Sequence, residues 1–169
     1  TEKLDLNLEI DKKVNELTNK SYVKLFDLNS LEVKNTVEYF YKQKIYTSHV
    51  PTDLTFHNKL ISVDEFLNVE DPNYNYGSFD IGTSLNSNVV KKICSMEKIW
   101  SIARKYLNSD EVKIYSINTM LTKKSEIKNY VVNLHVDFDC ANMLTFFVYW
   151  TDVSEINGAT RVLLGSHLF

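Results

Sequence analysis

The chain has 169 residues, of which 44% are hydrophobic and 24% are charged, and its formal net charge is −3. This composition is typical of one globular domain with a buried core and excludes a disordered chain. The scattered lysines and the weak negative charge argue against a nucleic-acid partner. No run reaches the roughly 18 apolar residues that a membrane span requires, and the N-terminus has no apolar signal core. We therefore expect a cytoplasmic protein without membrane partners.

The N-terminal part of the chain predicts two helices around a strand. Apolar residues recur at helical spacing over residues 8–19, which predicts a short amphipathic helix. Residues 21–28 predict a strand. Asn29 and Glu32 form a capping pair, and the apolar face that follows predicts a second helix over residues 33–41.

A second helix start is marked by a complete capping box. Ser62 and Glu65 are the two box residues, and Ile61 and Phe66 are placed to form the hydrophobic staple around them. We therefore expect a short helix to begin directly after Ser62.

Residues 68–88 show neither helical nor alternating periodicity and are rich in Asn, Tyr, Ser and Gly. This composition predicts a long loop. Loops of such length in a compact domain often bind substrate, although a solvated connector is the alternative. The candidate substrate contacts in this loop are Tyr74, Tyr76, Phe79 and Asp80.

The middle of the chain predicts one long helix and two strands. Apolar residues recur every three to four positions over residues 89–107, so this helix packs on the core. Residues 112–121 alternate as a strand that contains Asn118. Residues 144–150 predict an apolar strand buried on both faces and ending at Trp150.

His135 and Asp137 stand in the segment Tyr130–Asp139, which predicts a further strand. Successive side chains of a strand point to opposite faces, so these two project to the same side. An imidazole and a carboxylate from one strand, joined by a distant histidine, form the facial triad that holds non-heme Fe(II). We predict that both are metal ligands; the alternative is a sheet histidine beside a solvated aspartate. Asp139, one pleat further on the same face, is expected to face the substrate or to support a ligand.

The residues after His135-Val136-Asp137 follow one another in a familiar order. An apolar strand comes first, then Asn157-Gly158, and then the corner Gly165-Ser166-His167. This order resembles the phytanoyl-CoA dioxygenase-like branch of the Fe(II)/2-oxoglutarate-dependent oxygenases. The family usually has a proline where this chain has Leu164. Asn157-Gly158 and Gly165 supply the positive φ angles that tight turns require.

The predicted elements and the resemblance point to the same fold class. They indicate an α+β domain built around a double-stranded β-helix, the jelly roll of cupin-like proteins, with N-terminal helices on its outside. We expect residues 1–169 to form a single oxygenase-like domain.

The resemblance implies Fe(II) and 2-oxoglutarate as cofactors, and dioxygen and a small-molecule substrate as partners. The implied reaction hydroxylates the substrate while 2-oxoglutarate is decarboxylated to succinate. In related enzymes the strand before His-x-Asp lines the cofactor pocket. Asn118 is therefore a candidate 2-oxoglutarate contact or else a hydrogen-bonded sheet residue, and Trp150 either walls the cofactor or fills the core.

The family's third iron ligand is a histidine beyond the corner, followed by an arginine that binds 2-oxoglutarate. Neither follows His167 in this sequence. We therefore expect a C-terminally truncated fragment that lacks the last barrel strands. The resemblance implies that His167 is a structural turn residue, and the alternative is a stand-in metal ligand. Two alternatives stay open: a non-catalytic jelly-roll binding module without a complete metal triad, and a cupin-type hydrolase or isomerase with Zn or another divalent ion.

Overall fold

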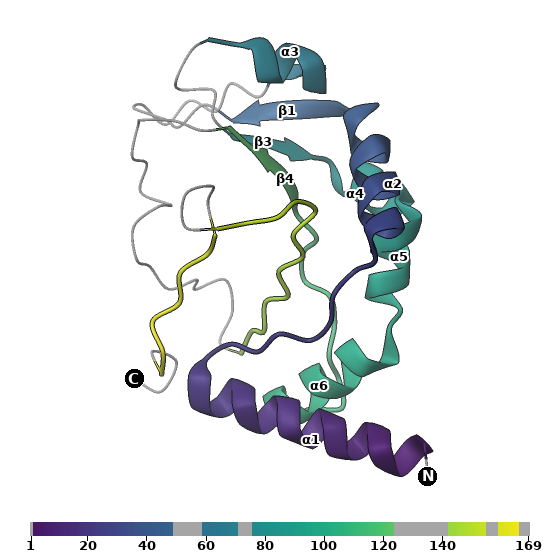
Figure 1. Cartoon of the computed structure of the whole chain (residues 1–169), viewed down its shortest axis with the longest axis vertical. Helices are drawn as coiled ribbons and strands as arrows, with labels where there is room; N and C mark the ends of the chain where they lie inside the picture. The colour runs from purple at the N-terminus through teal and green to yellow at the C-terminus, as the bar shows by residue number, and fades with distance from the viewer. Residues whose placement is uncertain (1, 49–58, 71–75, 124–141, 155–158, 166–169) are drawn as a thin grey trace. The chain divides into compact units, whose positions relative to one another are not determined.

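A computed structural model of the chain describes residues 2–48, 59–70, 76–123, 142–154 and 159–165 (Figure 1). These residues form helices and one antiparallel four-stranded sheet, which confirms the α+β class. They separate into two compact units. The first contains the chain up to Asn29, residues Lys92–Ile114 and the described residues from 142 onward, and the second contains Ser30–Lys91 and residues 115–123.

The second unit is built on the sheet. Its strands are β1 (Lys44–Ser48), β2 (Lys59–Ser62), β3 (Tyr76–Phe79) and β4 (Thr119–Thr122), in the spatial order β2-β1-β3-β4. Every neighbouring pair is antiparallel. Because side chains alternate along each strand, the sheet has one buried face and one exposed face.

The buried face carries the apolar core of the second unit. Ile45, Ile61 and Phe79 are each no more than 7% exposed, and Phe66 of α3 (Val63–Asn68) is fully buried above them. Phe40 of α2 (Ser30–Tyr41) stacks on Phe79 with ring centroids 4.8 Å apart. Helices α2 and α3 therefore cover this face of the sheet.

Helix α3 begins where the capping box predicts. The Ser62 side chain accepts a hydrogen bond from the Glu65 backbone N–H, and the Glu65 carboxylate accepts one from the Ser62 backbone N–H at 2.8 Å. Its C-terminal end is held by Lys123, whose Nζ donates to the carbonyls of Phe66 and Val69 at 2.9 and 2.7 Å.

The first unit packs two helices against each other, α1 (Glu2–Lys20) and α6 (Glu97–Leu107). Ile10 and Leu17 are the buried residues of α1, and Ile102 and Ala103 are those of α6. Helix α1 ends at Lys20, and the next residue, Ser21, has a left-handed φ of 69° and donates its N–H to the Leu17 carbonyl. The N-terminal helical prediction is therefore confirmed, with a longer helix.

The long helix expected over residues 89–107 is wrong as one element. It is divided into α5 (Asn88–Cys94) and α6. The Trp100 indole N–H donates to the Cys94 carbonyl at 2.7 Å. In an unbroken helix this carbonyl would instead accept a backbone N–H from the next turn, so the indole replaces a helical hydrogen bond. Met96 then starts α6 by accepting from the N–H groups of Ile99 and Trp100.

The loop expected over residues 68–88 is also wrong, because it contains β3 and the short helix α4 (Ile81–Asn86). Asp80 caps α4 by accepting the Thr83 N–H at 2.9 Å. Strand β3 lies between β1 and β4, so its hydrogen-bond partners come from distant parts of the sequence.

Three predicted strands differ from the structure as well. Residues 21–28 form no strand, and only the end of the strand expected over residues 112–121 belongs to the sheet. Residues 144–150 are neither a strand nor buried on both faces, since Phe147 is 63% exposed. Apolar composition alone therefore overestimated strand content. The described residues hold a single sheet, and the jelly roll stays a prediction, as does the single domain.

Candidate functional site

Four of the residues predicted to form the site, His135, Asp137, Asp139 and Tyr74, lie outside the described residues. Their roles stay predictions. Within the described part of the chain, no three His, Cys, Asp or Glu side chains are grouped so as to hold a metal ion.

Tyr76 belongs to β3 rather than to a loop, and its side chain is partly exposed. Its hydroxyl lies 2.6 Å from Met120 Sδ of β4, to which it donates a hydrogen bond. Asn118 is exposed and stands directly before β4. Tyr76 and Asn118 thus belong to neighbouring parts of one unit, on or beside the sheet.

Trp150 lies in the other unit and is partly buried. It neighbours Tyr149, whose hydroxyl donates to Thr160 Oγ1 at 2.6 Å. The structure therefore does not bring Trp150 together with Tyr76 or Asn118 within one unit.

Two other residues of the expected substrate loop have structural roles. Phe79 is 7% exposed and packs on Phe40 in the core. Asp80 accepts the Thr83 N–H and hydroxyl, and these hydrogen bonds hold the pKa of its carboxyl below the ordinary value. The signal for this cap was present in the sequence as Asp followed three residues later by Thr.

The exposed side of the sheet, here called the open face, was not identified from the sequence. Tyr46 lies opposite Leu60 on β2 and Ser78 on β3, and Ser78 lies opposite Met120 on β4. Tyr46, Leu60 and Met120 are 36%, 45% and 47% exposed. A row of mostly apolar side chains thus crosses all four strands on the side away from α2 and α3, and finding it required the strand register.

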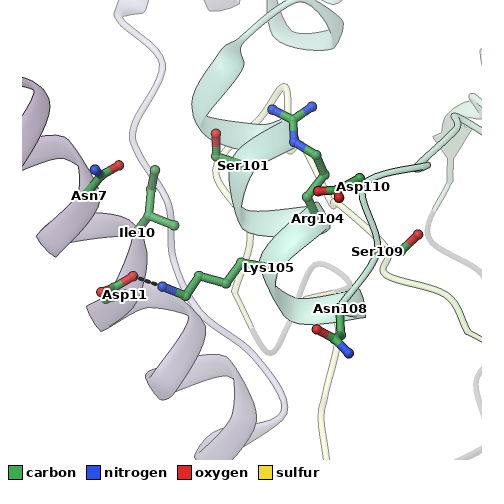
Figure 2. Close-up of a pocket in the computed structure, with 9 residues that line it drawn as sticks. All are labelled: Asn7, Ile10, Asp11, Ser101, Arg104, Lys105, Asn108, Ser109 and Asp110. Carbon is green, nitrogen blue, oxygen red and sulfur yellow. Dashed lines mark hydrogen bonds and ion pairs between the residues drawn. The ribbon is translucent and has the colours of Figure 1, made fainter.

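The first unit has an open groove of about 620 Å³ between α1 and α6 (Figure 2). The side chains that line it are mostly polar: Asn7, Ile10, Asp11, Ser101, Arg104, Lys105, Asn108, Ser109 and Asp110. Figure 2 shows Lys105 reaching across the groove to Asp11, with which it forms an ion pair.

The cations of α6 are held by carboxylates. Arg104 pairs with Glu97, and Lys98 pairs with Glu9 of α1 at 2.5 Å. The hydrogen bond from Lys98 lowers the pKa of Glu9. Glu9 and Asp11 flank the buried Ile10, so the two ion pairs between the helices fix how α6 crosses α1. This arrangement gives the charges beside the groove a structural role.

Comparisons with protein-family models, curated proteins and solved structures found no match to this chain. In the described residues, no helix is long and apolar enough to cross a membrane. The functional interpretation therefore depends on the chemistry of the chain's own residues.

Proposed function

We propose that the protein is an Fe(II)/2-oxoglutarate-dependent dioxygenase that resembles the phytanoyl-CoA dioxygenase-like family and has a jelly-roll core. The observation that carries this proposal is the His135-Val136-Asp137 spacing in the sequence, because an extended strand with this spacing places an imidazole and a carboxylate on one face. The residues that follow support it by their order, which ends at the corner beginning with Gly165.

The corner has the backbone conformation that the proposal requires at Gly165. This residue has a φ of 75°, and its N–H donates to Ser21 Oγ at 2.7 Å. Glycine adopts this left-handed conformation without steric cost. The Ala159 N–H donates to the Ser154 carbonyl at 3.1 Å, so the described residues on either side of 155–158 lie close together.

His135 and Asp137 suit Fe(II) by the chemistry of their donor atoms, because a neutral imidazole nitrogen and a carboxylate oxygen are two of the three facial-triad ligands. The bound iron would supply the activation of dioxygen and the oxidation of the substrate. The protein's own part is to hold the two ligands on one side of a strand and to orient the substrate beside them. Asn118 and Trp150 stay candidates for binding 2-oxoglutarate.

An anaerobic titration of the full-length gene product with Fe(II) and 2-oxoglutarate tests this proposal. We expect the weak visible charge-transfer band of the iron chelate to appear, and to be lost in the His135→Ala variant. A folded full-length protein that gives no band contradicts the oxygenase proposal and favours the non-catalytic binding module. Turnover without dioxygen would instead favour the cupin-type hydrolase or isomerase.

A further inference from the structure

The three methionines of the chain differ in their exposure. Met120 of β4 is 47% exposed, whereas Met96 and Met143 are partly buried. A thioether is oxidised to a sulfoxide only where the oxidant can reach it, so exposure decides which methionine reacts first. Met120 therefore has the methionine side chain that is most accessible to a small oxidant in water.

The strand register directs the Tyr76 hydroxyl to the Met120 sulfur. Tyr76 of β3 lies opposite Thr122 of β4, so Met120, two residues before Thr122, is its diagonal neighbour on the same face. An aromatic side chain is long enough to reach such a neighbour. The hydroxyl lies 2.6 Å from Met120 Sδ and donates a hydrogen bond to it. Two paired strands therefore hold the donor beside the sulfur.

Oxidation would give the Tyr76 hydroxyl a better acceptor at the same place. A thioether sulfur is only a weak hydrogen-bond acceptor. Oxidation adds one oxygen to the sulfur and makes the side chain polar, and this oxygen carries a partial negative charge. Because the phenol already lies beside Sδ, it reaches the new oxygen without a change in the pairing of β3 and β4. Tyr76 therefore stabilises the oxidised form of Met120 more than the reduced form.

We propose that Met120 is a site of reversible oxidation by hydroperoxides, and that Tyr76 is a positioning residue that binds the sulfoxide oxygen. In the reaction, a lone pair of Met120 Sδ forms a bond to one oxygen of the hydroperoxide while the O–O bond breaks. The proton on the transferred oxygen passes to the departing oxygen, which leaves as water or an alcohol. The sulfur loses two electrons and the hydroperoxide gains them. A methionine sulfoxide reductase restores the thioether.

This modification changes the character of the open face. Met120 belongs to the row of mostly apolar side chains that also contains Tyr46 and Leu60. A sulfoxide places a strong acceptor at the β4 end of this row. The core on the other face of the sheet, which contains Phe66 and Phe79, does not include Met120 and keeps its packing. The proposal uses only residues of β3 and β4 and is independent of the proposed iron site.

Peroxide treatment followed by peptide mapping tests which methionine reacts. Cys94 and Cys140 are first replaced by serine in the full chain, because thiols would consume the oxidant, and EDTA excludes metal-catalysed oxidation. Mass spectrometry then follows sulfoxide formation at each methionine in dilute hydrogen peroxide, both in buffer and in concentrated urea. We expect Met120 to react several-fold faster than Met96 and Met143 in buffer, and the difference to disappear in urea. Oxidation of Met96 or Met143 as fast as Met120 in the folded protein overturns the proposal.

Tyr76→Phe in the same cysteine-free chain tests the role of the hydroxyl, because it keeps the ring and removes the donor. Thermal melts compare each protein before and after Met120 has been converted to the sulfoxide. We expect the fall in Tm on oxidation to be larger in Tyr76→Phe, by about twofold, since only the protein with Tyr76 can donate to the sulfoxide oxygen. A fall that is equal or smaller in Tyr76→Phe overturns the positioning role. The oxidation rates of the three methionines test the site itself without any change at position 76.

Met120→Leu is the matched control, because it keeps an apolar side chain on β4 and has no sulfur to oxidise. Peroxide treatment of this variant measures the change in Tm that comes from the other two methionines. Adding Tyr76→Phe to Met120→Leu should leave that change as it is, since no sulfoxide stands at position 120 for the hydroxyl to bind. A larger change in the double variant would show that Tyr76 acts at another methionine and would overturn its assignment to Met120.

Discussion

The two units of this protein hold their helices in different ways. In the second unit, α2 and α3 cover a sheet through apolar side chains, and Phe66 and Ile45 have no exposed surface. In the first unit, α1 meets α6 through a few apolar residues, and ion pairs stand on both sides of the buried Ile10. Apolar burial contributes stability in proportion to the area removed from water, whereas exposed ion pairs contribute little and are screened by salt.

Apolar packing and ion pairs therefore have different roles in the two units. Packing supplies most of the stability in the sheet unit, and the ion pairs between α1 and α6 mainly select one crossing geometry. Substitutions in the sheet core should therefore lower the free energy of unfolding far more than substitutions at the ion pairs. Substitutions at four contacts test this contrast, in order of decreasing effect.

Phe66→Ala should have the largest effect. It removes a fully buried aromatic ring that lies over the sheet, and such truncations cost about 3–5 kcal/mol. Leu60→Ala, on the open face, is the matched control and should change stability by less than about 1 kcal/mol because Leu60 is 45% exposed. Urea denaturation measures both. Equal losses at the two positions would show that the open face is covered in solution.

Gly77→Ala tests how tightly the sheet core is packed. A Cβ at position 77 would lie 2.6 Å from Ile45 Cδ1, so we expect a loss of about 1–3 kcal/mol from overpacking. Ile45→Val removes the clashing methyl group. The double variant should therefore lose less than the sum of the two single losses in a denaturation cycle. Strict additivity would mean that Ile45 does not set the limit at Gly77.

Ser62→Ala should remove the capping box at the start of α3 and cost about 1 kcal/mol. The same box makes the stability pH-dependent, because hydrogen bonds from Ser62 lower the pKa of Glu65 in the folded state. The contribution of Glu65 is therefore fully present above its unfolded pKa and is lost as the pH falls through its lower, folded pKa.

The stability difference between the wild type and Glu65→Gln should accordingly shrink as the pH is lowered from 7 to 3. Thermal melts across this range measure it, with Asp64→Asn as a neighbouring acidic control. A difference that stays constant down to pH 3 would show that the Glu65 carboxylate does not contribute to the cap.

Glu9→Gln should have the smallest effect. Lys98 lowers the pKa of Glu9 in the folded state, so this contribution is also present above the unfolded pKa and lost on acidification. The Glu9 side chain is 45% exposed and that of Lys98 is 20% exposed, so salt can still screen the pair. We expect a small drop in Tm at low salt and a smaller one in 1 M NaCl. A drop of the same size at both salt concentrations would point to packing rather than charge as the role of Glu9.

Local signals predicted the helix starts better than they predicted the sheet. The capping box at Ser62 and Glu65 places α3 correctly because its hydrogen bonds join residues only three positions apart. Strand β3 was missed because Tyr76–Phe79 has no alternating hydrophobic pattern of its own: Gly77 occupies a core position. Its strand conformation depends on partners in β1 and β4.

The candidate site shows the same contrast between local and long-range signals. The His-x-Asp spacing is local. From this spacing, the sequence alone predicts two metal ligands on one face of a strand. The open face has no such signal, because Tyr46, Leu60 and Met120 come from separate strands and meet only through their register. Single exposed apolar residues are ordinary in a sequence, and only their alignment across a sheet makes them a surface.

By itself, the sequence determined where α3 begins, the helical character of the N-terminus and the left-handed turn at Gly165, since each depends on neighbouring residues. The tertiary structure decided the order of the four strands, the division between α5 and α6, and which side of the sheet stays open. Those features depend on hydrogen bonds and packing between residues far apart in the chain, such as the Trp100 indole on the Cys94 carbonyl and Phe66 above Gly77. Local propensity carries no information about such partners, because they become neighbours only when the chain folds.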